Sequence, residues 1–121
     1  MMVMRAKDRL GQNGEALAAD FLTDQGMRII DRNWRCAEGE IDIVAIDGDT
    51  LVVAEVKTRS SLDYGHPFEA VGAAKLARLH RLLSCWCRTH EFKASRQRVD
   101  VVSAVDGGVG DPVLEHLRGV G

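Results

Sequence analysis

Residues 40–58 read EIDIVAIDGDTLVVAEVKT, and this stretch decides the fold. Its two halves, Glu40–Asp47 and Thr50–Thr58, are rich in the β-branched residues that favour strands. The DGD sequence that joins them is typical of a tight turn. The stretch therefore predicts a β-hairpin.

Further elements are expected on both sides of this hairpin. Hydrophobic periodicity and turn residues predict a helix at about Leu10–Gln25, a strand at Met27–Trp34, a helix that could begin at Pro67 and run to about Thr89, a strand at Arg98–Val105 and a possible edge strand at Pro112–Leu117. The resulting order, αβββαβ with one possible further strand, predicts an α/β fold in which a mixed sheet is flanked by helices.

The composition is typical of a single folded domain that spans residues 1–121. Hydrophobic residues make up 45% of the chain and charged residues 28%. No apolar run is long enough to span a membrane. The first residues become charged before any apolar run develops, so we expect no secretory signal and a cytoplasmic protein.

Positive and negative charges are segregated along the chain. The net charge of −2 argues against a general nucleic-acid binder. However, residues 36–56 contain six acids and no Lys or Arg, whereas residues 75–98 carry seven basic residues and one acid. This pattern predicts a metal site beside a phosphate-binding surface, although a solvated helix face is the favoured interpretation for any single basic residue.

The side-chain alternation of the hairpin brings two carboxylates to one face. A turn centred on residues 48–49 places Asp42 directly across from Glu55, whereas a turn centred on residues 47–48 places Asp42 across from Val53. In both cases Asp42 and Glu55 share a face, and only a loop of odd length would separate them.

Paired carboxylates in apolar strands repel each other, which indicates a cation between them. Oxygen ligands without Cys or His favour Mg²⁺ or Mn²⁺. Lys57, on the same face as Glu55, could orient an attacking water, lower its pKa or stabilise charge on phosphorus. The alternative is that Glu55 and Lys57 form an ordinary surface ion pair.

Four further polar residues have ordinary structural explanations. Glu15 could be a first-helix acid that favours the helix dipole, and Glu40 could cap the solvent end of its strand. Lys75 could reach the sheet or extend into water. Arg98 could form a structural ion pair with Asp100.

Motifs along nearly the whole chain support a family resemblance. They read Gly14-Glu15-x2-Ala18, Gly39-Glu40-Ile41-Asp42, Glu55-Val56-Lys57-x-Arg59, Tyr64-Gly65, Lys75 and Arg98-x-Asp100-Val-Val. In this order they resemble the YraN-like uncharacterised protein family (family 0102). That family is assigned to the PD-(D/E)XK nuclease superfamily, which includes restriction endonucleases and Holliday-junction resolvases.

The resemblance implies a restriction-endonuclease-like αβββαβ core and assigns roles to individual residues. It implies that Asp42, Glu55 and the backbone carbonyl of Val56 bind the metal and that Lys57 is the catalytic lysine. It also implies that Glu15 contributes to catalysis through a direct or outer-sphere metal contact.

These observations together predict a Mg²⁺- or Mn²⁺-dependent endonuclease that hydrolyses DNA phosphodiester bonds, with selectivity for branched DNA in repair or recombination as one option. The residues expected to contact the nucleic-acid backbone are Arg59, Lys75, Arg78, Arg81 and Arg98. We also consider a homodimer, since a domain of this size cannot surround a duplex.

The alternative is a nucleic-acid-binding module that keeps the nuclease-like fold but does not cut. The intact set of Asp42, Glu55 and Lys57 favours the enzyme, whereas the modest net charge favours the module.

Overall fold

The computed structural model describes residues 6–60, 72–107 and 110–120, with side chains from Gly14 onward. Its elements are α1 (Ala6–Asp24), β1 (Arg28–Cys36), β2 (Gly39–Asp47), β3 (Thr50–Arg59), α2 (Ala73–Thr89), β4 (Arg96–Val105) and β5 (Val113–Leu117). Among the described residues, no helix is both long and apolar enough to cross a membrane.

The strands form one mixed sheet in the order β1-β2-β3-β4-β5. Neighbouring strands are antiparallel except for β3 and β4, which run parallel. A parallel pair requires a crossover connection, and α2 lies in the connection between these two strands. The predicted α/β class, mixed sheet and element order are confirmed, as is the edge strand β5. The arrangement matches a restriction-endonuclease-like core.

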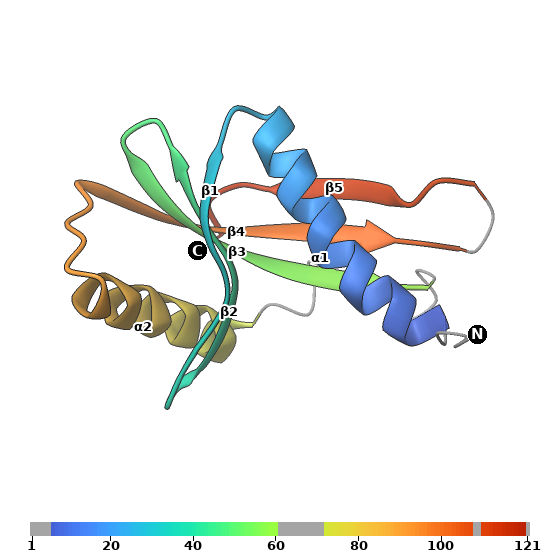
Figure 1. The fold of residues 1–121 in the computed structure, drawn as a ribbon. Coiled ribbons are helices and arrows are strands. Elements are labelled where there is room, and N and C mark those ends of the chain that lie inside the picture. The colour runs from blue at the N-terminus through green and yellow to red at the C-terminus, as the bar shows by residue number, and fades with distance from the viewer. Residues whose placement is uncertain (1–5, 61–71, 108–109, 121) are drawn as a thin grey trace.

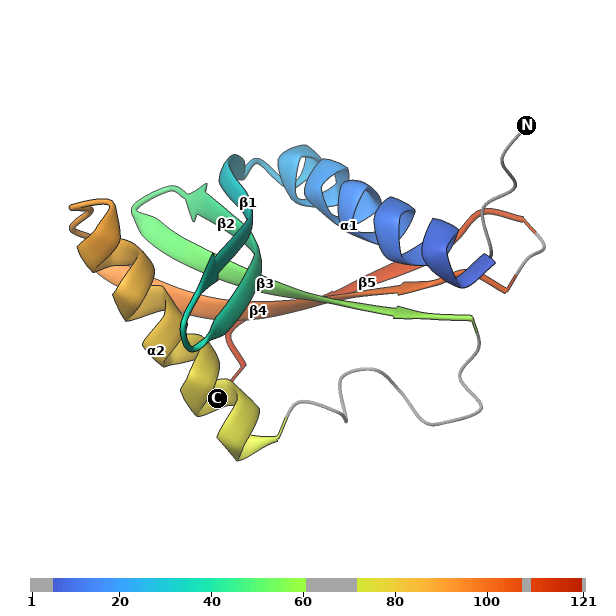
Figure 2. The same cartoon turned by 60° about the horizontal axis from the view of Figure 1, so that its bottom comes forward.

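The two helices cover opposite faces of the sheet (Figure 1), and Figure 2 shows the sheet between them. Alternation along β3 explains why both faces are apolar. Val52 and Ala54 pack in the cluster that includes Leu22 of α1, whereas Leu51 and Val53 pack with residues of α2. Glu55 and Lys57 follow Val53 at the same parity, so they point to the α2 face.

A glycine allows α1 to approach the sheet closely. Gly14 is buried, and a Cβ atom built on it would overlap the Cγ2 methyl of Thr58 in β3. The residue directly after it in α1 is Glu15. The close approach at Gly14 therefore sets how near Glu15 comes to the sheet.

The element boundaries differ from the predicted ones by a few residues. Helix α1 begins at Ala6 instead of Leu10, and β4 begins at Arg96 because its polar first residues already pair with Thr50 and Leu51 of β3. The predicted helix start at Pro67 lies outside the described residues. The helix that is described begins at Ala73.

Candidate functional site

The turn of the β2–β3 hairpin is centred on residues 48–49, the first of the two predicted alternatives. Asp47 pairs with Thr50, and the register continues to the pair of Ile43 with Ala54. One further step along this register places Asp42 opposite Glu55. The backbone pairing ends at this point, so the two carboxylates lie where the strands begin to separate.

The carboxylate of Asp42 replaces the missing backbone pairing. Its Oδ2 atom accepts a hydrogen bond of 2.8 Å from the N–H of Val56. Since the N–H and C=O of one strand residue point to the same side of the strand, the Val56 carbonyl also points toward β2. Two side-chain carboxylates and one backbone carbonyl therefore converge on the same gap between β2 and β3.

Asp42 is strongly perturbed by this environment. Burial and then the charge of Glu55 raise the pKa of Asp42 to about 7, although the Val56 hydrogen bond opposes the shift. Glu15 and Glu40 raise it further by smaller amounts. Near neutral pH Asp42 is therefore partly protonated when no cation is present, and a cation would stabilise its charged form.

Two lysines share one oxygen of Glu55. The Nζ atom of Lys75, from α2, lies 2.7 Å from Glu55 Oε1, and the Nζ atom of Lys57 lies 3.6 Å from the same oxygen. Burial, and then the hydrogen bond and charge of Lys75, lower the pKa of Lys57, with Glu55 offsetting part of this effect. Burial also acts to lower the pKa of Lys75, but its hydrogen bonds to Glu55 and Lys57 raise it overall.

Glu15 approaches the same region from α1. Its Oε1 atom is buried and has no hydrogen-bond partner within the described residues, and Arg32 Nε lies 3.9 Å from it in a long ion pair. Burial raises the pKa of Glu15, Arg32 opposes this, and Glu40 adds to it. In the described part of the chain, no three His, Cys, Asp or Glu side chains are close enough to hold a metal ion together. The charge of Glu15 nevertheless acts on Asp42, and its metal contact stays a prediction.

The donor set nevertheless fits a hard divalent ion. Mg²⁺ is usually held by one or two carboxylates, with water and substrate phosphates completing its coordination. Asp42, Glu55 and the Val56 carbonyl supply such a set. The Oε1 atom of Glu15, which has no hydrogen-bond partner among the described residues, is a further buried acceptor that a metal-bound water could satisfy.

Four of the five predicted phosphate-contacting residues lie on α2 or at the end of β3. Lys75 is in the site, and Arg78 is close enough for its charge to act on the pKa of Lys75. Arg81 is exposed on α2 and pairs with Glu38 at 3.5 Å. Arg59 is half-buried at the end of β3.

Arg98, the fifth of these residues, lies away from Glu55 and Lys75. It pairs in register with Val52, so it lies on the α1 face of the sheet, opposite Glu55 and Lys57. Its guanidinium binds Asp100 at 2.8 Å and Asp47 at 2.9 Å. The predicted structural ion pair between Arg98 and Asp100 is confirmed, and this pairing occupies the side chain that was also expected to contact nucleic acid.

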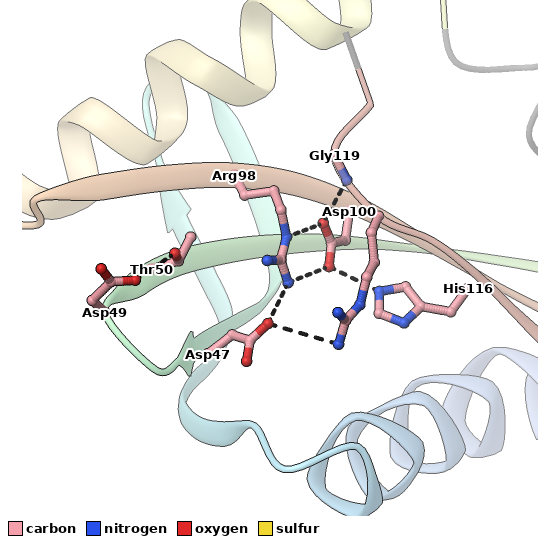
Figure 3. A network of polar contacts seen from close by, with 8 residues as sticks. Asp47, Asp49, Thr50, Arg98, Asp100, His116 and Gly119 are labelled. Atoms are coloured by element: carbon pink, nitrogen blue, oxygen red, sulfur yellow. Dashed lines mark hydrogen bonds and ion pairs between the residues drawn. The ribbon is translucent and has the colours of Figure 1, made fainter.

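Figure 3 shows the network around this ion pair. Asp100 is fully buried and also accepts hydrogen bonds from His116 Nε2, at 2.8 Å, and from the N–H of Gly119, at 2.9 Å. Hydrogen bonds to Arg98 hold the pKa of Asp100 below its ordinary value despite burial. The network therefore joins β4 to β5 and to the residues that follow it.

Sequence reasoning missed two residues near Glu15. Arg32 forms the ion pair described above, and Asn33 hydrogen-bonds to Glu15 and thereby lowers its pKa. Asn33 has a φ of 54°, a left-handed conformation that Asn adopts more readily than most residues. An Asn inside a predicted strand was the one available signal, and it indicates an irregularity rather than a site.

The sheet order and its two covering helices define an α/β protein with a core like that of restriction endonucleases. The chain belongs to the family described as Uncharacterised protein family UPF0102, whose sequence model matches residues 14–104.

Several bacterial proteins that carry the name UPF0102 protein are similar over almost the whole chain. The protein of Paenarthrobacter aurescens is 78% identical over 99% of both chains. That of Arthrobacter sp. (strain FB24) is 72% identical over 98% of this chain and 100% of its own. That of Pseudarthrobacter chlorophenolicus is 65% identical over 97% of this chain and 89% of its own.

Proposed function

We propose that this protein is a Mg²⁺- or Mn²⁺-dependent endonuclease of the PD-(D/E)XK superfamily that hydrolyses DNA phosphodiester bonds, with branched DNA as the preferred substrate class. Three further expectations stay predictions: that the protein forms a homodimer, that it is cytoplasmic, and that residues 1–121 form a single domain.

One observation carries the proposal: Asp42 and Glu55 converge beside two lysines at the open end of a buried hairpin. The pairing is unfavourable for the fold alone, because burial and mutual repulsion raise the pKa of Asp42 to about 7. Perturbed carboxylates of this kind gather at functional sites more often than elsewhere. A binder of phosphates has little use for acids that repel them.

The proposed roles follow from the positions of the side chains. Asp42, Glu55 and the carbonyl of Val56 would hold the divalent ion, which supplies Lewis-acid activation of water and neutralises charge on the scissile phosphate. Lys57 lies beside Glu55 and its pKa is lowered. Its amine is therefore suited to form a hydrogen bond with the attacking water or to transfer a proton to or from it. Lys75 and Arg78 supply positive charge for the phosphates on either side of the reaction centre.

The test is cleavage of linear, single-stranded, flapped and four-way-junction DNA with Mg²⁺, with Mn²⁺ and with chelator. We expect metal-dependent cleavage that falls at least about 100-fold in Asp42→Ala and in Lys57→Ala. Asp49→Asn is the matched control, since it removes an exposed carboxylate from the turn of the same hairpin. It should cleave like the wild-type protein.

The ion pair of Lys75 with Glu55 also suits the alternative, a nucleic-acid-binding module in which a lysine neutralises the site permanently. Binding to all four DNA forms without cleavage, with both metals and with circular dichroism showing folded protein, would favour that module and contradict the nuclease.

A further inference from the structure

Lys75 occupies the position at which a cation meets Glu55. Its Nζ atom lies 2.7 Å from Glu55 Oε1, a short charge-assisted hydrogen bond, and Lys57 Nζ lies 3.6 Å from the same oxygen. A divalent ion bound to Glu55 would be repelled by this ammonium and would compete with it for the negative charge of the carboxylate. Metal binding at Glu55 therefore favours a movement of Lys75 away from it.

The position of Lys75 in its helix is unfavourable without Glu55. Lys75 is in the first turn of α2, where the helix dipole disfavours a positive charge. The described helix has no acidic residue in that turn and no side-chain cap, and Arg78 adds a like charge one turn later. Among the described residues, Glu55 is the anion that balances this charge. If Glu55 is engaged elsewhere, Lys75 needs another anion.

We propose that Lys75 is a surrogate cation: it neutralises Glu55 in the free protein and transfers to a phosphate of the nucleic acid when a divalent ion takes Glu55. The identity of the ion and of the polyanion rests on the proposed nuclease function. The exchange makes the two binding events cooperative, because each ligand satisfies one of the two charges that the broken ion pair leaves behind. By thermodynamic linkage, nucleic acid then raises metal affinity by the same factor as metal raises nucleic-acid affinity.

The first arm of the test uses Mn²⁺ alone. Metal-free full-length protein is titrated with Mn²⁺, and free Mn²⁺ is measured by electron paramagnetic resonance for wild type, Lys75→Met and Arg88→Met. Lys75→Met should bind Mn²⁺ about fivefold or more tightly than wild type. Arg88→Met removes one charge from the exposed far end of the same helix and should stay within about twofold of wild type, since it makes no contact with Glu55.

The second arm uses a short labelled DNA duplex, confirmed intact after each measurement. Its affinity is followed by fluorescence anisotropy with Mn²⁺ and with chelator at matched ionic strength. Mn²⁺ should tighten binding to the wild-type protein and to Arg88→Met. In Lys75→Met the increase in DNA affinity caused by Mn²⁺ should be smaller than in the wild-type protein. The ratio of the two increases should be about the ratio of the Mn²⁺ affinities of variant and wild type.

The outcomes separate this proposal from the nuclease proposal. Tighter Mn²⁺ binding by Lys75→Met in a protein that cleaves nothing would support the exchange and reject the nuclease. Equal or weaker Mn²⁺ binding by that variant, in a protein that does cleave, would overturn the exchange alone. If circular dichroism shows that Lys75→Met is not folded, Lys75→Gln gives the same readout with a polar side chain that suits a helix.

Discussion

Among single residues, Asp42 shows the strongest conflict between stability and the proposed chemistry. It is held near Glu55 by its hydrogen bond to the Val56 N–H, and it is buried enough that its charged form is disfavoured. The same features that destabilise the charged side chain prepare it to bind a divalent ion, because the ion removes the repulsion. The cost to the metal-free protein can be measured through pH.

Substitution Asp42→Asn should remove this pH-dependent cost. The pKa of Asp42 is about 7 in the folded protein against an ordinary value of 3.8, so between these values the folded state keeps a proton that the unfolded state has lost. The contribution of this group to the free energy of unfolding therefore falls as pH rises from about 4 to about 7. In urea denaturation with chelator, the stability of the variant relative to wild type should increase by about 2–4 kcal/mol between pH 4.5 and pH 8. A difference that stays constant with pH would contradict the assigned environment.

The carboxylate pair could be predicted from sequence because strand alternation and turn length are local properties. Once the turn is centred on residues 48–49, Asp42 and Glu55 must meet. The contact of Lys75 with Glu55 could not be predicted, because it depends on where α2 crosses the sheet. The same holds for the Glu15 oxygen that lacks a hydrogen bond, because its surroundings depend on the approach of α1 and on the conformation of Asn33.

At the scale of secondary-structure elements, two contacts fix the sheet and its first helix. Asp100 joins β4 to β5 and to Gly119 through hydrogen bonds to its fully buried carboxylate. Gly14 sets the distance between α1 and β3. The alternating pattern of β4 predicted the pair of Arg98 with Asp100. The contribution of Asp47 to this network was not predicted, because it joins strands distant in the sequence.

Substitution Asp100→Asn should destabilise the protein by about 3–5 kcal/mol, since it leaves Arg98 without its buried counter-charge. Asp49→Asn is the control, because its ion pair with Arg96 is exposed and 3.7 Å long, and it should cost less than about 1 kcal/mol. Both values come from urea denaturation at neutral pH. Equal effects of the two substitutions would show that the network does not hold β4 and β5 together.

Substitution Gly14→Ala should destabilise the protein by about 1–3 kcal/mol although alanine favours helices, because the new methyl group meets Thr58. Thr58→Ser removes only the methyl group that is in the way. In that background Gly14→Ala should become neutral or stabilising, so the two effects should not add. Thermal denaturation of the four proteins measures the coupling, and an unchanged cost in the Thr58→Ser background would exclude this contact as its origin.

In the whole molecule, the sheet separates two polar regions. The α2 face carries Glu55, Lys57 and Lys75, whereas the α1 face carries the ion pair of Arg98 with Asp100. The separation places Arg98 on the other face of the sheet from Lys75, although both belong to the same basic stretch of the sequence. The fold was predictable because apolar periodicity and turn residues mark its elements, but the assignment of Arg98 to the α1 face required the register between β3 and β4.

The most direct test of the central claim is the anomalous scattering of Mn²⁺ in crystals of the protein grown with a short DNA duplex. The account predicts one strong peak within roughly 2–2.5 Å of a carboxylate oxygen of Asp42 and of Glu55, with Lys75 moved away from Glu55. A structure at high Mn²⁺ concentration in which Lys75 still binds Glu55, and in which no peak lies between the two carboxylates, would contradict it.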